Sequence, residues 1–99
     1  MTYADDVSAD RRLVILRLLS EDPGYSHNDR VLQTALARIG HAVSRDAVRS
    51  DMAWLAEQGL ATVEVIENEV HVAKLTERGA DVAAGRATVP GVKRPSPGR

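Results

Sequence analysis

The hydrophobic period of the chain changes abruptly at Gly59, and this change limits the folds that are available to it. Before Gly59, apolar residues recur every three to four positions, as they do on one face of a helix. After it, Ala61–Ile66 and Val70–Leu75 are rich in β-branched residues and are joined by Glu-Asn-Glu at 67–69. Asn tolerates the positive φ that a tight connection needs, so we expect a β-hairpin. Helical segments followed by a hairpin predict an α+β fold.

The first helical segment spans about residues 8–20, with Ser8 as its N-cap. Its apolar residues occupy most of the helix circumference rather than a single stripe. Such a helix either lies at the centre of the core or is buried in part by another chain. In a domain of this size, the second alternative predicts a homodimer that forms through this helix. Pro23 and Gly24 end the segment.

Two further helical segments follow, separated by a very short connection. The first spans about residues 27–39, begins at a capping box formed by Ser26 and Asp29, and ends at Gly40. The second begins at Ser44, whose hydroxyl caps the first free amides, and continues to Gln58. Because only three residues separate Gly40 from Ser44, the two helices must be joined by a tight turn.

A short helix and a basic segment complete the chain. Thr76 caps a helix over about residues 76–84, and Gly85 ends it. The last fourteen residues carry four Lys/Arg and no Asp/Glu, and they hold three of the four prolines. Proline and glycine at this density cannot support a helix or a central strand. We therefore expect one folded domain over residues 1–86 and an extended basic tail over residues 87–99.

The expected order of elements is that of a winged helix-turn-helix domain, with a three-helix core, a two-stranded hairpin wing and a short C-terminal helix. The stretch from Ser44 to Leu60 resembles the recognition helix and wing entry of winged-helix transcription regulators of the MarR, PadR and ArsR types. Leu-Thr-Glu-Arg-Gly at 75–79 is similar to the Leu-Thr-x-x-Gly element that follows the wing in MarR- and PadR-like members. The whole chain also resembles small winged-helix proteins of Mu-like phages and prophages. The resemblance implies sequence-specific binding of double-stranded DNA and a role in transcription regulation.

The resemblance also implies which side chains of the third helix contact DNA. In such folds the N-terminal part of this helix enters the major groove. Arg45 and Arg49 lie one turn apart on the expected solvent face, and an arginine can bind guanine bidentately. Ser44 and Ser50 can donate to phosphates. Asp46 can accept from a cytosine amino group, or it can pair with either arginine and restrain it.

The basic tail has three alternative roles. As a DNA arm, its Lys93, Arg94 and Arg99 would follow a phosphate backbone or enter a minor groove. As a disordered extension it would contact nothing. As a docking segment it would use Val89 and Val92 to bind a neighbouring subunit, so the tail is a second candidate for the homodimer contact.

The hairpin departs from the pattern of the family. Wings that touch DNA usually present Arg or Lys, whereas this hairpin carries Glu64, Glu67 and Glu69, with Lys74 as the one base in its strands. Carboxylates facing phosphates would repel them. Either the wing points away from DNA, or the domain does not bind DNA through the usual face.

The composition excludes several other classes of function. A formal net charge of −1 excludes a globally basic nucleic-acid binder. The chain has no Cys, and His27, His41 and His71 are too widely spaced to complete a metal site, so we expect no metal and no cofactor. No phosphate loop or nucleophile elbow is present, so we expect no enzyme. The absence of Cys, and of an apolar run near the roughly 20 residues of a membrane span, predicts a cytoplasmic protein.

Two functions therefore remain open from the sequence. One is a homodimeric transcription regulator that binds double-stranded DNA. The other is a winged-helix module that has lost DNA binding and recognises protein, which the acidic wing and the near-neutral net charge favour. Trp54 is expected to pack against the first helix or the hairpin, with a partner-binding anchor as the alternative.

Overall fold

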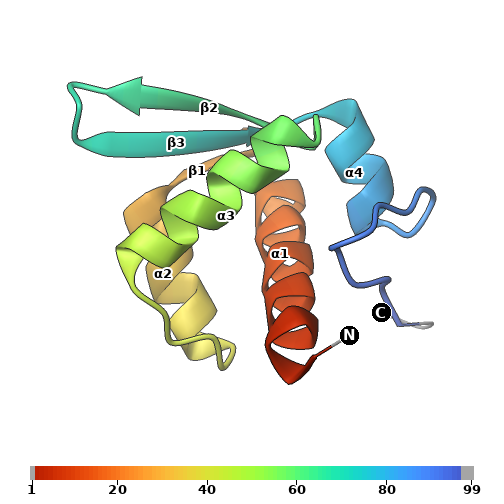
Figure 1. The fold of residues 1–99 in the computed structure, drawn as a ribbon. Coiled ribbons are helices and arrows are strands. Elements are labelled where there is room, and N and C mark those ends of the chain that lie inside the picture. Colours follow the sequence, from red (N-terminus) through yellow and green to blue (C-terminus); the bar gives the residue numbers. More distant parts are fainter. Residues whose placement is uncertain (1, 97–99) are drawn as a thin grey trace.

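A computed structural model describes residues 2–96 and has a mixed α+β architecture (Figure 1). In chain order, its elements are α1 (Tyr3–Glu21), β1 (Ser26–Asn28), α2 (Asp29–Arg38), α3 (Arg45–Glu57), β2 (Ala61–Ile66), β3 (Val70–Leu75) and α4 (Glu77–Ala83). The strands form one antiparallel sheet in the order β1-β3-β2. The predicted α+β class is confirmed, and the sheet has one strand more than the predicted hairpin.

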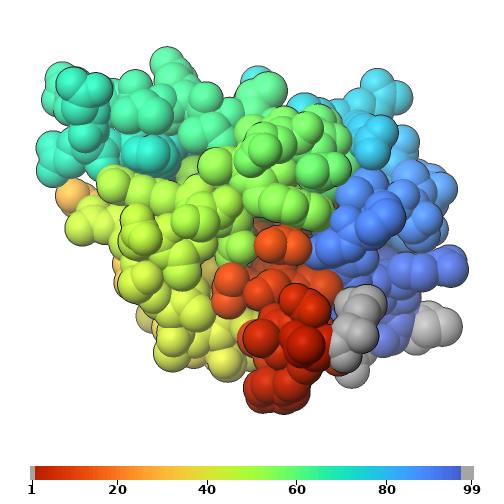
Figure 2. Space-filling model, viewed as in Figure 1, coloured from red at the N-terminus to blue at the C-terminus, as the bar shows by residue number. Residues whose placement is uncertain are grey.

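Helix α1 begins earlier than predicted, because Thr2 rather than Ser8 is its N-cap. The Thr2 hydroxyl accepts a hydrogen bond from the Asp5 amide at 3.1 Å, and the Asp5 carboxylate accepts one from the Thr2 amide at 3.2 Å. This capping box adds two turns that project below the rest of the molecule in the view of Figures 1 and 2. Further along, the most apolar part of α1 is buried in the core of its own chain, at Leu13, Ile15, Leu16 and Leu19.

The predicted start of the second helix is wrong, because residues 26–28 form strand β1 instead. Ser26 pairs with Lys74 of β3, and the ladder continues to Asn28 opposite Val72. The N-cap of α2 is Asn28, whose side-chain oxygen accepts from the Val31 amide at 2.8 Å. Ser26 and Asp29 therefore do not form the predicted capping box.

Helix α3 and the hairpin agree closely with the sequence. The Ser44 hydroxyl accepts from the Ala47 amide at 3.1 Å, as predicted for an N-cap. Strands β2 and β3 have the predicted bounds. The tight connection between them holds Glu67 and Asn68 at φ of 53° and 55°. The predicted positive φ at Asn68 is confirmed.

Helix α4 begins at the predicted cap, Thr76, and packs against α1. Gly79 is buried inside this helix, and a Cβ atom there would lie 1.9 Å from the Leu60 carbonyl oxygen. The glycine therefore permits α4 to pass directly over the entry to the hairpin.

The segment after α4 packs on the body of the molecule instead of leaving it. Val89 and Val92 are only 5% and 8% exposed and belong to the same core as α1. The Lys93 amide donates to the Ala9 carbonyl at 3.1 Å, and Arg12 donates to the Gly91 carbonyl at 3.1 Å. Residues 87–96 have no helix or strand, but they are part of the folded unit, and the two valines dock on their own chain.

Trp54 is a packing residue, as expected, and it packs against Arg12 of α1, the first helix, and also against the C-terminal segment. The Arg12 guanidinium carbon lies 4.1 Å from the Trp54 ring centroid. Gly91 lies against the six-membered ring of the indole with a φ of 96°, where a Cβ would come within 2.7 Å of Trp54 Cζ2. Arg12 and Trp54 thus hold the C-terminal segment against α1.

Candidate functional site

The side chains of α3 that were predicted to contact DNA are in different situations. The Ser44 hydroxyl is used as the helix cap. Asp46 and Ser50 are exposed. Arg45 is half-buried, and it makes no ion pair or side-chain hydrogen bond with any residue that the structure describes. Among the two predicted arginines, Arg45 therefore keeps an available guanidinium.

The second predicted arginine, Arg49, is half-buried and bound to neighbouring elements. Its Nε donates to Oδ2 of Asp29 on α2 at 2.6 Å, and its Nη2 donates to the carbonyl oxygen of Glu69 in the turn before β3. Asp29 is fully buried, so its carboxylate requires a positive partner. The prediction that Arg49 presents a free guanidinium is wrong, because this side chain joins α2, α3 and the hairpin.

The charge of Asp29 keeps this contact in place. Burial raises the pKa of the Asp29 carboxyl, but the hydrogen bond and the positive charge of Arg49 outweigh it and leave the pKa below its ordinary value. The carboxyl is therefore ionised at neutral pH, and Arg49 stays bound to it.

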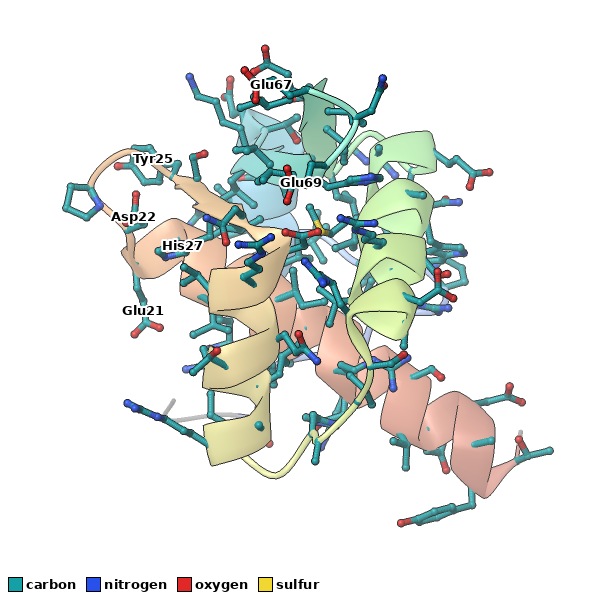
Figure 3. The ribbon with its side chains drawn as sticks, turned by 90° about the vertical axis from the view of Figure 1, so that its left-hand side faces the viewer. Glu21, Asp22, Tyr25, His27, Glu67 and Glu69 are labelled. Atoms are coloured by element: carbon teal, nitrogen blue, oxygen red, sulfur yellow. The ribbon has the colours of Figure 1, made fainter. Side chains whose placement is uncertain are left out.

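The outer surface of α3 and the hairpin is acidic. We call it the α3–hairpin face and define it by its exposed carboxylates together with Arg45 and Lys74. Arg30, which lies beside it, pairs with Glu69 at 3.3 Å. Figure 3 shows Glu67 and Glu69 at the hairpin, apart from Glu21 and Asp22 at the end of α1. The carboxylates of this face are those of Asp46, Glu57, Glu64, Glu67 and Glu69.

Helix α2 carries a shallow apolar groove on its outer surface. We call this the α2 groove, and its lining residues fall into two rows along the helix. One row is apolar, and its end members Val31 and Ile39 are 44% and 54% exposed. The other is polar, and Arg38 within it makes no ion pair with the described residues. The lining residues are Arg30, Val31, Thr34, Ala35, Arg38 and Ile39.

A second groove runs along α1 and holds the predicted tail residues. Lys93 and Arg94 line it together with Val14 and Leu18, and Ile39 belongs to both grooves. Lys93 and Arg94 therefore contribute to the α1–α2 side of the molecule, away from the α3–hairpin face. Arg99 lies outside the described residues.

Asp10 connects three parts of the chain at the edge of this second groove. Its carboxylate lies 2.7 Å from Nε2 of His41 in the turn before α3, and 3.5 Å from Nζ of Lys93. Burial raises the pKa of the Asp10 carboxyl. The hydrogen bond with His41 and the charge of Lys93 outweigh this effect and leave the pKa below its ordinary value. Lys93 is therefore paired rather than free.

Sequence reasoning missed two buried carboxylates that organise the charged side chains. Asp29 shares the buried face of α2 with Leu32 and Leu36, and Asp51 lies between Val48 and Leu55 on that of α3. Asp51 is 3% exposed and binds Arg11 and Arg12 of α1. An acidic residue at an apolar position of each helical stripe was the available signal, because such a residue must find a cation.

Residues 2–96 contain no group of three or more His, Asp or Glu side chains arranged to hold a metal ion. Over the same range, no helix combines the length and apolar character that crossing a membrane requires.

The chain has relatives among phage and bacterial proteins. It is 54% identical over 93 residues to the uncharacterized protein gp26 of Escherichia phage Mu, an alignment that covers 94% of this chain and 95% of gp26. The chain belongs to the gp26 family. It is also 42% identical over 78 residues to an uncharacterized protein of Haemophilus influenzae, covering 79% of this chain and 76% of that protein. The expected relationship to Mu-like phages is confirmed, whereas no family model and no solved structure matches the chain.

Proposed function

We propose that this gp26 relative is a winged helix-turn-helix module that binds protein rather than duplex DNA, through its α1–α2 side. In this arrangement α2 and α3 are the helix-turn-helix pair, β2 and β3 form the wing, and α4 is the C-terminal helix. The element order and the short connection between α2 and α3 support the assignment.

The observation that carries the proposed function is the exposed apolar row of the α2 groove. Val31 and Ile39 keep about half of their surface in contact with water. Ile39 also lines the groove on α1, where Val14 and Leu18 lie beside charged residues, so the two grooves meet at this side chain. Contiguous apolar surface with a polar rim is typical of protein interaction sites.

The energy of the Arg49 contact argues against the duplex alternative. A bidentate contact between an arginine and guanine is worth about 1–3 kcal/mol. Withdrawing Arg49 from the buried Asp29 would leave an uncompensated carboxylate, and breaking a buried pair in this way costs about 3–5 kcal/mol. The internal contact is therefore the stronger one, and the carboxylates of the α3–hairpin face add repulsion of phosphates.

Site-specific photo-cross-linking tests the proposed function with a matched pair of positions. A photoreactive amino acid replaces either Ala35 in the α2 groove or Ala53 on the exposed side of α3, and cells that produce the chain are irradiated. We expect discrete protein adducts from position 35 and none from position 53. The absence of adducts at position 35, or equal adducts at both positions, would contradict the assignment.

Duplex DNA binding by a homodimer that regulates transcription is the second candidate, and the unpaired Arg45 guanidinium in the first turn of α3 favours it. If this function is correct, Arg45→Ala lowers specific duplex affinity by roughly 1–3 kcal/mol, because a base contact is lost. Fluorescence anisotropy with duplexes selected from a random pool measures the change. The affinity must also fall steeply with salt. A parent chain with no duplex affinity at low salt eliminates this candidate.

A further inference from the structure

The two rows of the α2 groove have a fixed relation to each other. The apolar row has members four residues apart, at Val31, Ala35 and Ile39, and each member of the polar row immediately precedes one of them. With a rise of about 1.5 Å per residue, each row is about 12 Å long. The polar row has an arginine at each end, of which Arg30 pairs with Glu69 and Arg38 makes no ion pair with the described residues. The groove therefore suits a helix of about two turns that carries negative charge beside Arg38.

The projecting start of α1 has the same arrangement with the opposite charge. Tyr3 and Val7 lie four residues apart on one side of the helix, and Tyr3 is 84% exposed, more than any other large apolar side chain among the described residues. Asp6 immediately precedes Val7, is exposed, and makes no ion pair with residues 2–96. These first turns stand away from the body of the molecule in Figures 1 and 3, and another molecule can reach the exposed Tyr3 and Asp6 and the half-buried Val7.

Antiparallel packing brings the opposite charges together. When two helices pack face to face and antiparallel, the residues that immediately precede the contact residues lie on the same side of the interface in both helices. In parallel packing they lie on opposite sides. With Tyr3 placed against Ile39, Val7 meets Ala35, because both pairs are four residues apart. Asp6 then lies between Thr34 and Arg38, within reach of the Arg38 guanidinium.

We propose that the α2 groove binds a second copy of this chain, and that the occupant is the first two turns of α1. The inference rests on the proposed function and names the partner for it. The contact is small, so association is reversible, depends on protein concentration and weakens with salt. It also gives a role to the capping box at Thr2, since this box folds the two turns that enter the groove.

Charge reversal tests the pairing of these two surfaces. Sedimentation velocity of the purified chain over a range of concentrations at low salt measures association of the parent, Asp6→Arg, Arg38→Glu and the double variant. We expect each single variant to associate at least tenfold more weakly than the parent. The double variant should recover most of the loss, because its opposite charges are exchanged between the two surfaces. Arg78→Glu, an exposed charge reversal on α4, is the control and should associate like the parent.

Several outcomes would overturn the inference. These are a parent that stays monomeric at every concentration, single variants that associate like the parent, or a double variant that recovers nothing while its circular dichroism and thermal unfolding match the parent's. The mass of the adduct from position 35 separates this failure from failure of the proposed function. An adduct of twice the chain mass supports a second copy, an adduct with a different protein overturns only the identity of the partner, and no adduct overturns both.

Discussion

Arg49 on α3 and Arg38 on α2 carry the same charged group, but they differ in whether that group has an ionic partner. Arg49 binds a fully buried carboxylate and a backbone carbonyl, whereas Arg38 borders an apolar groove without an ionic partner in the described chain. The difference shows that a buried acidic residue decides which cations are available to a ligand. The α3–hairpin face is left acidic, and the available positive charge accompanies apolar surface on α2.

The largest expected effect follows from removing the internal partner. Arg49→Ala should lower the free energy of unfolding by about 3–5 kcal/mol, because it leaves Asp29 charged and buried. Urea unfolding measures this loss. Arg45→Ala, one turn earlier on the same helix, is the matched control and should change stability by less than about 0.5 kcal/mol. Equal, small effects for both variants would mean that Arg49 is as free as Arg45.

A smaller effect is expected when pH is lowered. Asp29 has a pKa below its unfolded value of about 3.9, so the unfolded chain takes up the proton first. The stabilisation that ionised Asp29 contributes is complete above the unfolded-state pKa. It is lost as pH falls through the lower, folded-state pKa. Urea unfolding of the parent and of Asp29→Asn between pH 6 and pH 2.5 should show a stability difference that is constant down to about pH 5 and narrows below pH 4. Parallel curves would contradict an ionised, arginine-bound Asp29. Asp10 also has a lowered pKa, but it is present in both the parent and Asp29→Asn, so its contribution cancels from the stability difference.

The smallest effect on stability is expected in the α2 groove. Ile39→Ser removes a side chain that is 54% exposed, so the free energy of unfolding should change by about 0.5 kcal/mol or less. Association measured by sedimentation should nevertheless weaken, because Ile39 supplies apolar contact area. A large loss of stability with unchanged association would make Ile39 a core residue rather than part of a binding surface.

Local patterns predicted much of the fold. The hairpin bounds, the Ser44 cap and the Thr76 cap follow from periodicity and from side chains that bond neighbouring amides. Strand β1 could not be predicted in this way, since Ser-His-Asn has no apolar alternation and pairs with β3 far along the chain. The start of α1 was missed because its signals are short: one apolar pair four residues apart, Tyr3 and Val7, and the capping box of Thr2 and Asp5.

The candidate site was predicted less well, because long-range contacts decide which charges are available. The bond between Arg49 and Asp29 joins residues on different helices, and the helical period of α3 alone places Arg49 beside Arg45 on a solvent face. The composition of residues 87–99 predicted an extended tail with three alternative roles, among them docking of Val89 and Val92 on a neighbouring subunit, whereas these valines dock residues 87–96 on α1 of their own chain. Asp29 and Asp51, at apolar positions of their helices, were the residues that indicated these contacts.

Amide chemical-shift mapping by two-dimensional NMR tests the central comparison most directly. Spectra are recorded as the protein concentration rises, and again as a random-sequence duplex is added at low salt. We expect shifts that grow with protein concentration in Tyr3–Val7 and Val31–Ile39, and no saturable change in α3 or the hairpin with duplex. Saturable changes across α3 and the hairpin with duplex, and none in α2 with concentration, would contradict this expectation.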